Sequence, residues 1–331
     1  MKKVLSMLLT LALVLPSLAQ ADRYRLSLST WGSPKHPQVT QFVPKFVEAV
    51  EERSEGRIRF RVFEGGEMVK QQFVPTAVPQ GTVDISLTTL DSWSGRIPEI
   101  SILASPLWTW SMTTSRDNLV PGKPVFDYFD QKLRDRGAFM IAMFDIGPPV
   151  LSTRFEIEKP EDLKGRTMRV YSKGAGQVMQ ALGAAPTTLG VGEVYSALQR
   201  GTVDGAMGGL GGAVGLKHFE VTDYMFDQGG ALGTLVHAYV MNLDKFEQLP
   251  PDLQKVVMEA AHEARTHAQQ YMIDSFDDLL ETVRAEGNTV ARLKPGTSEW
   301  DTWRSALKPL VEQAKETYPA DLVKIVEAQA D

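Results

Sequence analysis

The sequence predicts an α/β protein of two lobes that share one long helix. Stretches that alternate apolar and polar residues precede stretches with helical spacing, an order that favours mainly parallel sheets flanked by helices. A short pattern near residue 80 recurs near residue 200. A helix over the amphipathic residues 252–284 would be about 50 Å long, which exceeds the diameter of one small domain.

The first 21 residues have the features of a secretory signal peptide. Two lysines precede an apolar run over residues 4–15, and Ala19-Gln20-Ala21 has the small-x-small pattern of a cleavage site. The run is too short for a transmembrane anchor, which takes about 20 residues. We therefore expect residues 1–21 to be removed and the mature protein to be exported.

Length and charge limit the number of domains and the kinds of partner that the remaining chain can have. Removal of 21 residues from 331 leaves 310, which fits two domains better than one, because single cores stop growing near about 250–300 residues. The net charge of −6 becomes −8 without the two lysines, and no basic stripe suggests a nucleic-acid partner. The sequence has no cysteine, which excludes disulfides and thiolate chemistry.

The first elements follow from periodicity. Residues 24–30 and 58–63 alternate as strands do, and residues 38–53 carry apolar side chains at helical spacing, with Gly56 as the stop. Farther along, Ala-Val-Pro-Gln-Gly-Thr-Val-Asp at 77–84 resembles Ala-Leu-Gln-Arg-Gly-Thr-Val-Asp at 197–204. In each, a helix would end at a left-handed Gly before a strand. Chance is one explanation of this internal similarity, and two similarly built lobes is the other.

Catalytic and cofactor motifs are incomplete. His262 and His267 are five residues apart, about 140° around a helix, so they cannot hold one zinc ion as histidines at i and i+4 do. The Gly-rich run 208–215 has Val214 where a dinucleotide fingerprint needs Gly. We interpret it as a connection that lets a ligand or the other lobe approach the backbone. We expect no metal, no cofactor and no enzyme mechanism.

Arg169 is the strongest candidate for ligand binding. It lies between Met168 and Val170 in a short apolar strand, and no acid lies within six residues of it. Because a buried guanidinium without a partner is strongly unfavourable, a ligand carboxylate is a suitable partner for the planar arginine fork. A solvated or structural arginine is the alternative.

The motif around Arg169 resembles the signature of TRAP-transporter solute-binding proteins of the DctP type. Asp162-Leu163-Lys164-Gly165 and Met168-Arg169-Val170 carry it, and residues 181–205 continue it in order. The resemblance implies a periplasmic binding protein fold, with crossing strands and the long helix spanning both lobes. It also implies an organic acid captured in the cleft, its carboxylate on Arg169, and delivery to a permease of one small and one large membrane subunit.

The expected lobes are residues 22–146 with about 235–274, and residues 147–234 with about 275–331. Two departures from the family concern the ligand. Pro148 and Pro149 stand where many members carry a second arginine, and Gly208 stands where they carry an asparagine. We therefore expect an aromatic or apolar monocarboxylate, including a keto or hydroxy acid, bound by a monomer. An exported enzyme or a ligand sensor on the same fold are the alternatives.

Six further residues are candidates for the ligand pocket. Aromatic walls suit flat or apolar ligands, and strand ends are where ligands bind in such sheets. These candidates are Trp31, Trp93, Trp108, Tyr171, Met207 and His237. For each tryptophan, ordinary core packing is the alternative, and His237 could equally be a satisfied histidine beside a strand.

Overall fold

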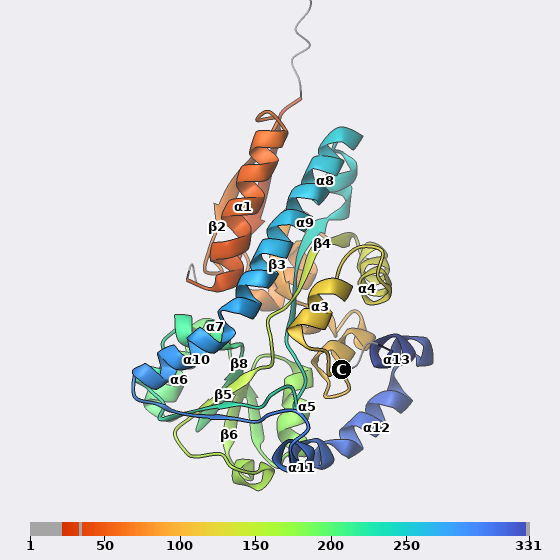
Figure 1. Ribbon diagram of the computed structural model, residues 1–331. Helices are drawn as coiled ribbons and strands as arrows, with labels where there is room; N and C mark the ends of the chain where they lie inside the picture. Colours follow the sequence, from red (N-terminus) through yellow and green to blue (C-terminus); the bar gives the residue numbers. More distant parts are fainter. Residues whose placement is uncertain (1–21, 33–34, 329–331) are drawn as a thin grey trace, which may run out of the picture.

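Two β-sheets with separate sets of helices form the two lobes of the molecule (Figure 1). The structure is a computed structural model that describes residues 22–32 and 35–328. The predicted signal peptide, residues 1–21, lies outside the described residues. No helix in the described part of the chain is long and apolar enough to cross a bilayer.

The first lobe, in the upper half of Figure 1, contains a five-stranded sheet in the order β2-β1-β3-β10-β4. Its strands are β1 (Tyr24–Ser29), β2 (Ile58–Phe63), β3 (Ile85–Thr89), β4 (Ala138–Asp145) and β10 (Val236–Asn242). Its longer helices are α1 (Pro37–Arg53), α3 (Met112–Asn118), α4 (Pro124–Arg134) and α9 (Pro251–Asp274), and its short ones are α2 (Val74–Ala77) and α8 (Leu243–Glu247). The sequence predictions of the first strand, the first helix and the second strand are confirmed.

The second lobe contains a six-stranded sheet in the order β11-β9-β5-β8-β6-β7. Its strands are β5 (Val150–Thr153), β6 (Thr167–Val170), β7 (Ala185–Thr188), β8 (Gly205–Gly208), β9 (Tyr224–Asp227) and β11 (Thr289–Arg292). Its helices are α5 (Lys173–Ala181), α6 (Val194–Arg200), α7 (Leu210–Gly215), α10 (Phe276–Ala285) and α11 (Ser298–Ala306).

Both sheets are mainly parallel, as expected, and each contains one strand that runs against the others. β10 is antiparallel to β3 and β4, and β5 is antiparallel to β8 and β9. These are the strands by which the chain enters one lobe from the other. Each begins where its neighbours end, as the pairs Val236–Asp145 and Val150–Asp227 show, so it must run against them.

The predicted long helix is two helices. α9 ends at Asp274, Ser275 interrupts the regular geometry, and α10 begins at Phe276. α9 packs on α1 and β4 of the first lobe, whereas α10 packs on α7 and β11 of the second. Because each helix follows its own lobe, a straight helix over residues 252–284 does not form, but the pair spans both lobes as predicted (Figure 1).

The C-terminal segment differs from its predicted place in the second lobe. After α12 (Lys308–Thr317), α13 (Ala320–Glu327) packs on α4 of the first lobe. The Trp110 indole also donates to the Val326 carbonyl at 2.8 Å. Leu322 and Val326 are fully buried there, so hydrophobic burial returns this end of the chain to the first lobe.

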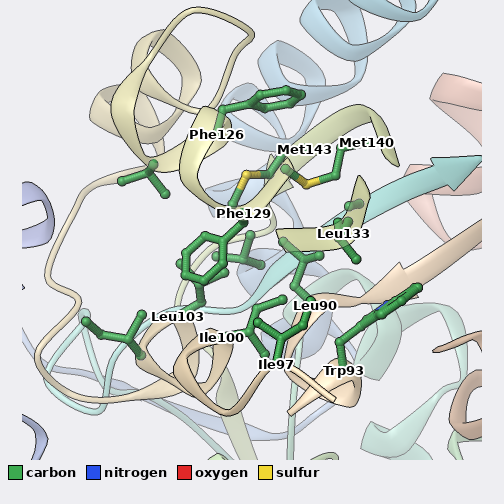
Figure 2. Close-up of a cluster of buried hydrophobic side chains, with 14 of the residues drawn as sticks. Leu90, Trp93, Ile97, Ile100, Leu103, Phe126, Phe129, Leu133, Met140 and Met143 are labelled. Carbon is green, nitrogen blue, oxygen red and sulfur yellow. The ribbon is translucent and has the colours of Figure 1, made fainter. Parts of the chain in front are cut away.

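Apolar side chains cover both faces of the first sheet. One cluster lies between the sheet, α1 and α9, and a second lies on the opposite face with α4 and α13. Figure 2 shows part of the second cluster, in which Phe129 and Leu133 of α4 lie above Ile97 and Ile100. These layers fix the sheet and leave the carboxyl ends of β1 and β3 free to face the second lobe.

Candidate functional site

A cavity lies between the carboxyl ends of the two sheets. It contains about 490 Å³ of empty space, part of it open to solvent. The first lobe contributes Trp31, His36, Gln71, Thr89 and His237 to its wall, and the second lobe contributes Arg169, Tyr171, His218 and the glycines that begin α7. Ligands of α/β sheets commonly bind at this edge, where several connections converge.

The repeated sequence pattern builds the same joint in each lobe. Gly81 and Gly201 have φ values of 70° and 71°, a left-handed conformation that favours glycine. After each of these glycines, an aspartate side chain accepts a hydrogen bond from the backbone of the neighbouring strand. Asp84 Oδ2 accepts from the Ser27 backbone N–H at 2.7 Å, and Asp204 Oδ2 accepts from the Thr167 N–H at 2.7 Å. This match favours two similarly built lobes over chance.

The two joints place Trp31 and Tyr171 in equivalent positions. Leu28 of β1 pairs with Ile85, and Met168 of β6 pairs with Gly205. Trp31 and Tyr171 follow those strands at the same spacing, and both line the cavity, one from each lobe. Burial raises the pKa of Tyr171, with a further contribution from the Asp91 charge, so its phenol stays protonated.

Arg169 is buried in the second lobe, with 4% of its surface exposed, and lines the cavity. Its Nε and Nη2 donate to the Leu189 carbonyl at 3.1 and 2.9 Å, and its Nη1 donates to the Met207 carbonyl at 3.0 Å. No ion pair within residues 22–32 and 35–328 includes Arg169. Burial lowers its pKa to about 10, so it stays charged at neutral pH.

These contacts leave the guanidinium ready to bind an anion. A guanidinium carries five N–H groups in a fixed fork, and the three bonds to carbonyls use three of them. One N–H remains on each terminal nitrogen, and a pair of N–H groups on one guanidinium can hold a carboxylate through two parallel bonds. The backbone carbonyls fix the direction of the fork without neutralising its charge.

His237 lies in a chain of hydrogen bonds within the first lobe. The Gln71 amide donates to Thr89 Oγ1 at 2.7 Å, Thr89 Oγ1 lies 3.1 Å from His237 Nε2, and His237 Nδ1 lies 2.7 Å from Gln38 Oε1. An amide oxygen only accepts, so Nδ1 donates to Gln38 and Nε2 accepts from the threonine hydroxyl. Both ring nitrogens are therefore occupied, and His237 presents only its ring to the cavity.

His36 and His218, which the sequence analysis did not identify, also line the cavity. Burial lowers the pKa of His36 to about 4. Burial, followed by the charge of Arg169, lowers the pKa of His218 to about 4, and burial and the nearby His36 hold the pKa of His237 well below its usual value. At neutral pH all three imidazoles are uncharged. Their positions 36, 218 and 237 gave no sequence pattern that could have grouped them.

We predict that the unliganded protein loses stability as the pH falls from about 6.5 to about 4. In that interval the unfolded chain binds protons at His36 and His218 that the folded chain does not, so the free energy of unfolding falls with the pH. Each histidine contributes on the order of 3 kcal/mol over the interval. Urea unfolding at several pH values measures this slope.

The variant His218→Gln isolates one of these contributions. In this variant the free energy of unfolding should fall less steeply with decreasing pH than in the wild type. The difference should equal the contribution of one histidine, because the other titrating groups are common to both proteins. Identical slopes in the two proteins would contradict the assignment of an uncharged His218.

The structure places three candidates outside the cavity wall. Trp93 is fully buried in the cluster of Figure 2, where its Nε1 donates to Thr88 Oγ1 at 3.1 Å. Trp108 is fully buried beside Trp110, with ring centroids 4.2 Å apart. Met207 packs its side chain into the core of the second lobe, and only its carbonyl meets Arg169. Both tryptophans are therefore packed in the hydrophobic core, which was the alternative interpretation.

The Gly-rich run has the role that its composition indicated. Gly208, Gly209 and Gly212 line the cavity around the start of α7. A Cβ at Gly209 would lie 2.7 Å from Ile146 Cδ1, and one at Gly211 would lie 3.0 Å from Pro37 Cγ. Side chains at these positions would crowd Ile146, which follows β4, and Pro37 at the start of α1, so glycine favours the close approach of the two lobes.

The incomplete metal motif lies away from the cavity. Glu263 pairs with Arg53 and Lys45, and His267 Nε2 lies 3.2 Å from Gln41 Oε1 on the exposed side of α9. Within the part of the chain that the structure describes, no three His, Cys, Asp or Glu side chains are grouped to hold a metal ion.

Comparisons with known proteins agree with this architecture. The model of bacterial extracellular solute-binding protein family 7, DctP, matches residues 28–317. The C4-dicarboxylate-binding periplasmic protein DctP of Rhodobacter capsulatus is 24% identical over 323 residues, which cover 97% of this chain and 94% of that protein.

Two solved structures share the fold. DctP7 of Bordetella pertussis, an extracytoplasmic solute receptor binding pyroglutamic acid, is 20% identical with a TM-score of 0.84 over 93% of this chain and 99% of that one. A TRAP periplasmic solute binding protein from Sulfurospirillum deleyianum with bound succinate is 24% identical with a TM-score of 0.83 over 93% and 99%. The predicted two-lobed binding-protein fold is confirmed.

Proposed function

The chain belongs to family 7 of the bacterial extracellular solute-binding proteins, and we propose that it captures a monocarboxylate with an apolar or aromatic body. In this proposal the carboxylate binds Arg169 of the second lobe. The body of the ligand fills the cavity between that lobe and Trp31 of the first. The relatives named above are binding proteins, and we infer binding without catalysis for this chain as well.

The observation that carries the proposal is the single charge of the cavity. Among the described residues that line it, Arg169 is the one charged side chain, and the three histidines are neutral. Much of the remaining wall is apolar and includes Ile146, Val191, Val194, Leu216 and Leu235. A mostly apolar cavity with one fixed charge suits a ligand with one charge and an apolar remainder.

The departures from the family pattern support the same ligand class. Pro148 and Pro149 supply no second cation. A Cβ at Gly208 would lie 3.6 Å from Arg169 Nη1, so glycine leaves that side of the guanidinium open to the ligand. A second carboxylate in the first-lobe part of the cavity would lose water without gaining a positive partner, which is strongly unfavourable.

The cellular setting is part of the proposal. The signal-like residues 1–21 favour export to the periplasm. The resemblance to TRAP receptors favours delivery of the acid, by a monomer, to a permease with one small and one large membrane subunit. An exported enzyme on this fold would convert its ligand, so a product assay with the purified protein separates the two functions.

A thermal-shift screen of organic acids tests the ligand class. Aromatic and branched monocarboxylates should raise the melting temperature more than succinate does, because a second charge has no partner in the cavity. A ligand at about 100 times its Kd adds about 2.7 kcal/mol of stability, or several degrees. If succinate gave the largest shift, the inference of a monocarboxylate site would be wrong.

A further inference from the structure

Two buried polar atoms of the cavity wall have no partner in the protein. They are Trp31 Nε1 in the first lobe and His218 Nε2 in the second. Among the described side chains that line the cavity, no other buried nitrogen or oxygen lacks a hydrogen bond. His218 is 94% buried, so bulk water does not readily compensate for the missing bond. Because both atoms lie in the cavity wall, a ligand in the cavity can supply the partners that buried polar groups need.

The two atoms need different hydrogen-bond partners from the ligand. An indole nitrogen only donates, so Trp31 Nε1 needs an acceptor. The rings of His36 and His237 lie 6.5 and 5.3 Å from the Trp31 ring, and neither is charged at neutral pH. Since this side of the cavity offers no cation among its described residues, the acceptor that suits it is a neutral oxygen rather than a carboxylate.

His218 is near the other end of the ligand. His218 and Arg169 both line the second-lobe part of the cavity wall. A neutral imidazole has one N–H to donate. Its Nε2 is therefore suited to donate to the carboxylate that Arg169 holds.

We propose that the ligand is a monocarboxylate that also carries a carbonyl or hydroxyl oxygen, and that Trp31 Nε1 selects for this oxygen. His218 Nε2 completes the carboxylate site beside Arg169. The inference rests on the proposed function and narrows its ligand class to oxo and hydroxy acids. Because Trp31 and Arg169 belong to different lobes, such a ligand also links the two lobes.

Matched acids that differ only in this oxygen test the selection by Trp31. The probes are 4-methyl-2-oxopentanoate against 4-methylpentanoate, and 4-oxopentanoate against pentanoate, each titrated by calorimetry. In at least one pair the oxo acid should bind wild-type protein at least about tenfold more tightly than its matched acid. The matched acid lacks the oxygen and therefore leaves the buried Trp31 donor unpaired. In Trp31→Phe, which keeps an aromatic ring, this preference should fall below about threefold.

Trp300→Phe is the matched control. The Trp300 indole donates to the Gly229 carbonyl at 3.0 Å in the second lobe, and the residue does not line the cavity, so the preference should remain. An unchanged preference in Trp31→Phe, or no preference in either pair for the wild type, would overturn the role of Trp31 while leaving the monocarboxylate site intact. Failure of all four acids to bind would instead contradict the proposed function and this inference together.

Discussion

Replacement of Arg169 by alanine is expected to abolish ligand binding and to leave the protein folded. Arg169 carries the only charge among the described cavity-lining side chains, so its loss leaves a buried carboxylate without a positive partner. Removal of one side of such a pair weakens binding by about 100-fold or more. Calorimetric titration with the monocarboxylate that gives the largest thermal shift measures the loss.

Arg265 offers a matched control for this experiment. It is 3% exposed, burial lowers its pKa to about 10, and it donates to the carbonyls of Met143 and Ser115, much as Arg169 donates to Leu189 and Met207. It lies on α9 and does not line the cavity. Arg265→Ala should therefore lower stability with ligand affinity nearly unchanged. Equal affinities of wild type and Arg169→Ala would refute the role of Arg169.

The same two arginines show how far sequence could identify the site. Arg169 stood out because apolar neighbours surround it in a short strand and because its motif resembles a known signature. Arg265 follows Ala264 within a helical pattern, where a long charged side chain is usually solvated, yet it is equally buried. Its partners come from β4 and α3, far away in the sequence, and local pattern carries no information about them.

The tryptophans show a similar limit. Trp31 and Trp93 both follow strands of the first sheet, so sequence placed both at the edge that binds ligands. The 3-10 turn Leu90–Trp93 directs Trp93 into the hydrophobic cluster, whereas Trp31 follows β1 without such a turn and lines the cavity. The side of the sheet that a side chain reaches depends on turn geometry, which residue type alone does not determine.

For the fold, elements with a clear period were predictable and the direction of two strands was not. Alternation and helical spacing located β1, α1 and β2. The directions of β5 and β10 depend on where the chain crosses between the lobes, which is a non-local property. The break at Ser275 likewise follows from packing of α9 and α10 on different lobes, since the apolar stripe of the sequence runs through it without interruption.

Two of the crossings between the lobes, those that lead to β5 and β10, meet at Asp145. This carboxylate has no exposed surface, and its Oδ1 accepts from the Gly147 N–H at 2.9 Å and from the Thr234 hydroxyl. Its Oδ2 accepts from Ser115 Oγ at 2.6 Å. Gly147 lies on the crossing that leads to β5, and Thr234 lies on the one that leads to β10. One side chain therefore fastens both connections to each other and to α3.

We expect Asp145→Ala to lower the free energy of unfolding by about 3–5 kcal/mol, because it leaves three buried donors unpaired and removes a negative charge that acts on Arg265. Urea denaturation of the unliganded protein measures the change.

Asp145→Asn keeps one acceptor oxygen, so its free energy of unfolding should fall less than that of Asp145→Ala. Asp301→Ala, at an exposed position of α11, should change the free energy of unfolding by no more than about 0.5 kcal/mol. Burial raises the pKa of Asp145, and its hydrogen bonds and the charge of Arg265 oppose that rise. A loss in Asp145→Ala no larger than that in Asp301→Ala would mean that the crossings are held together by other contacts.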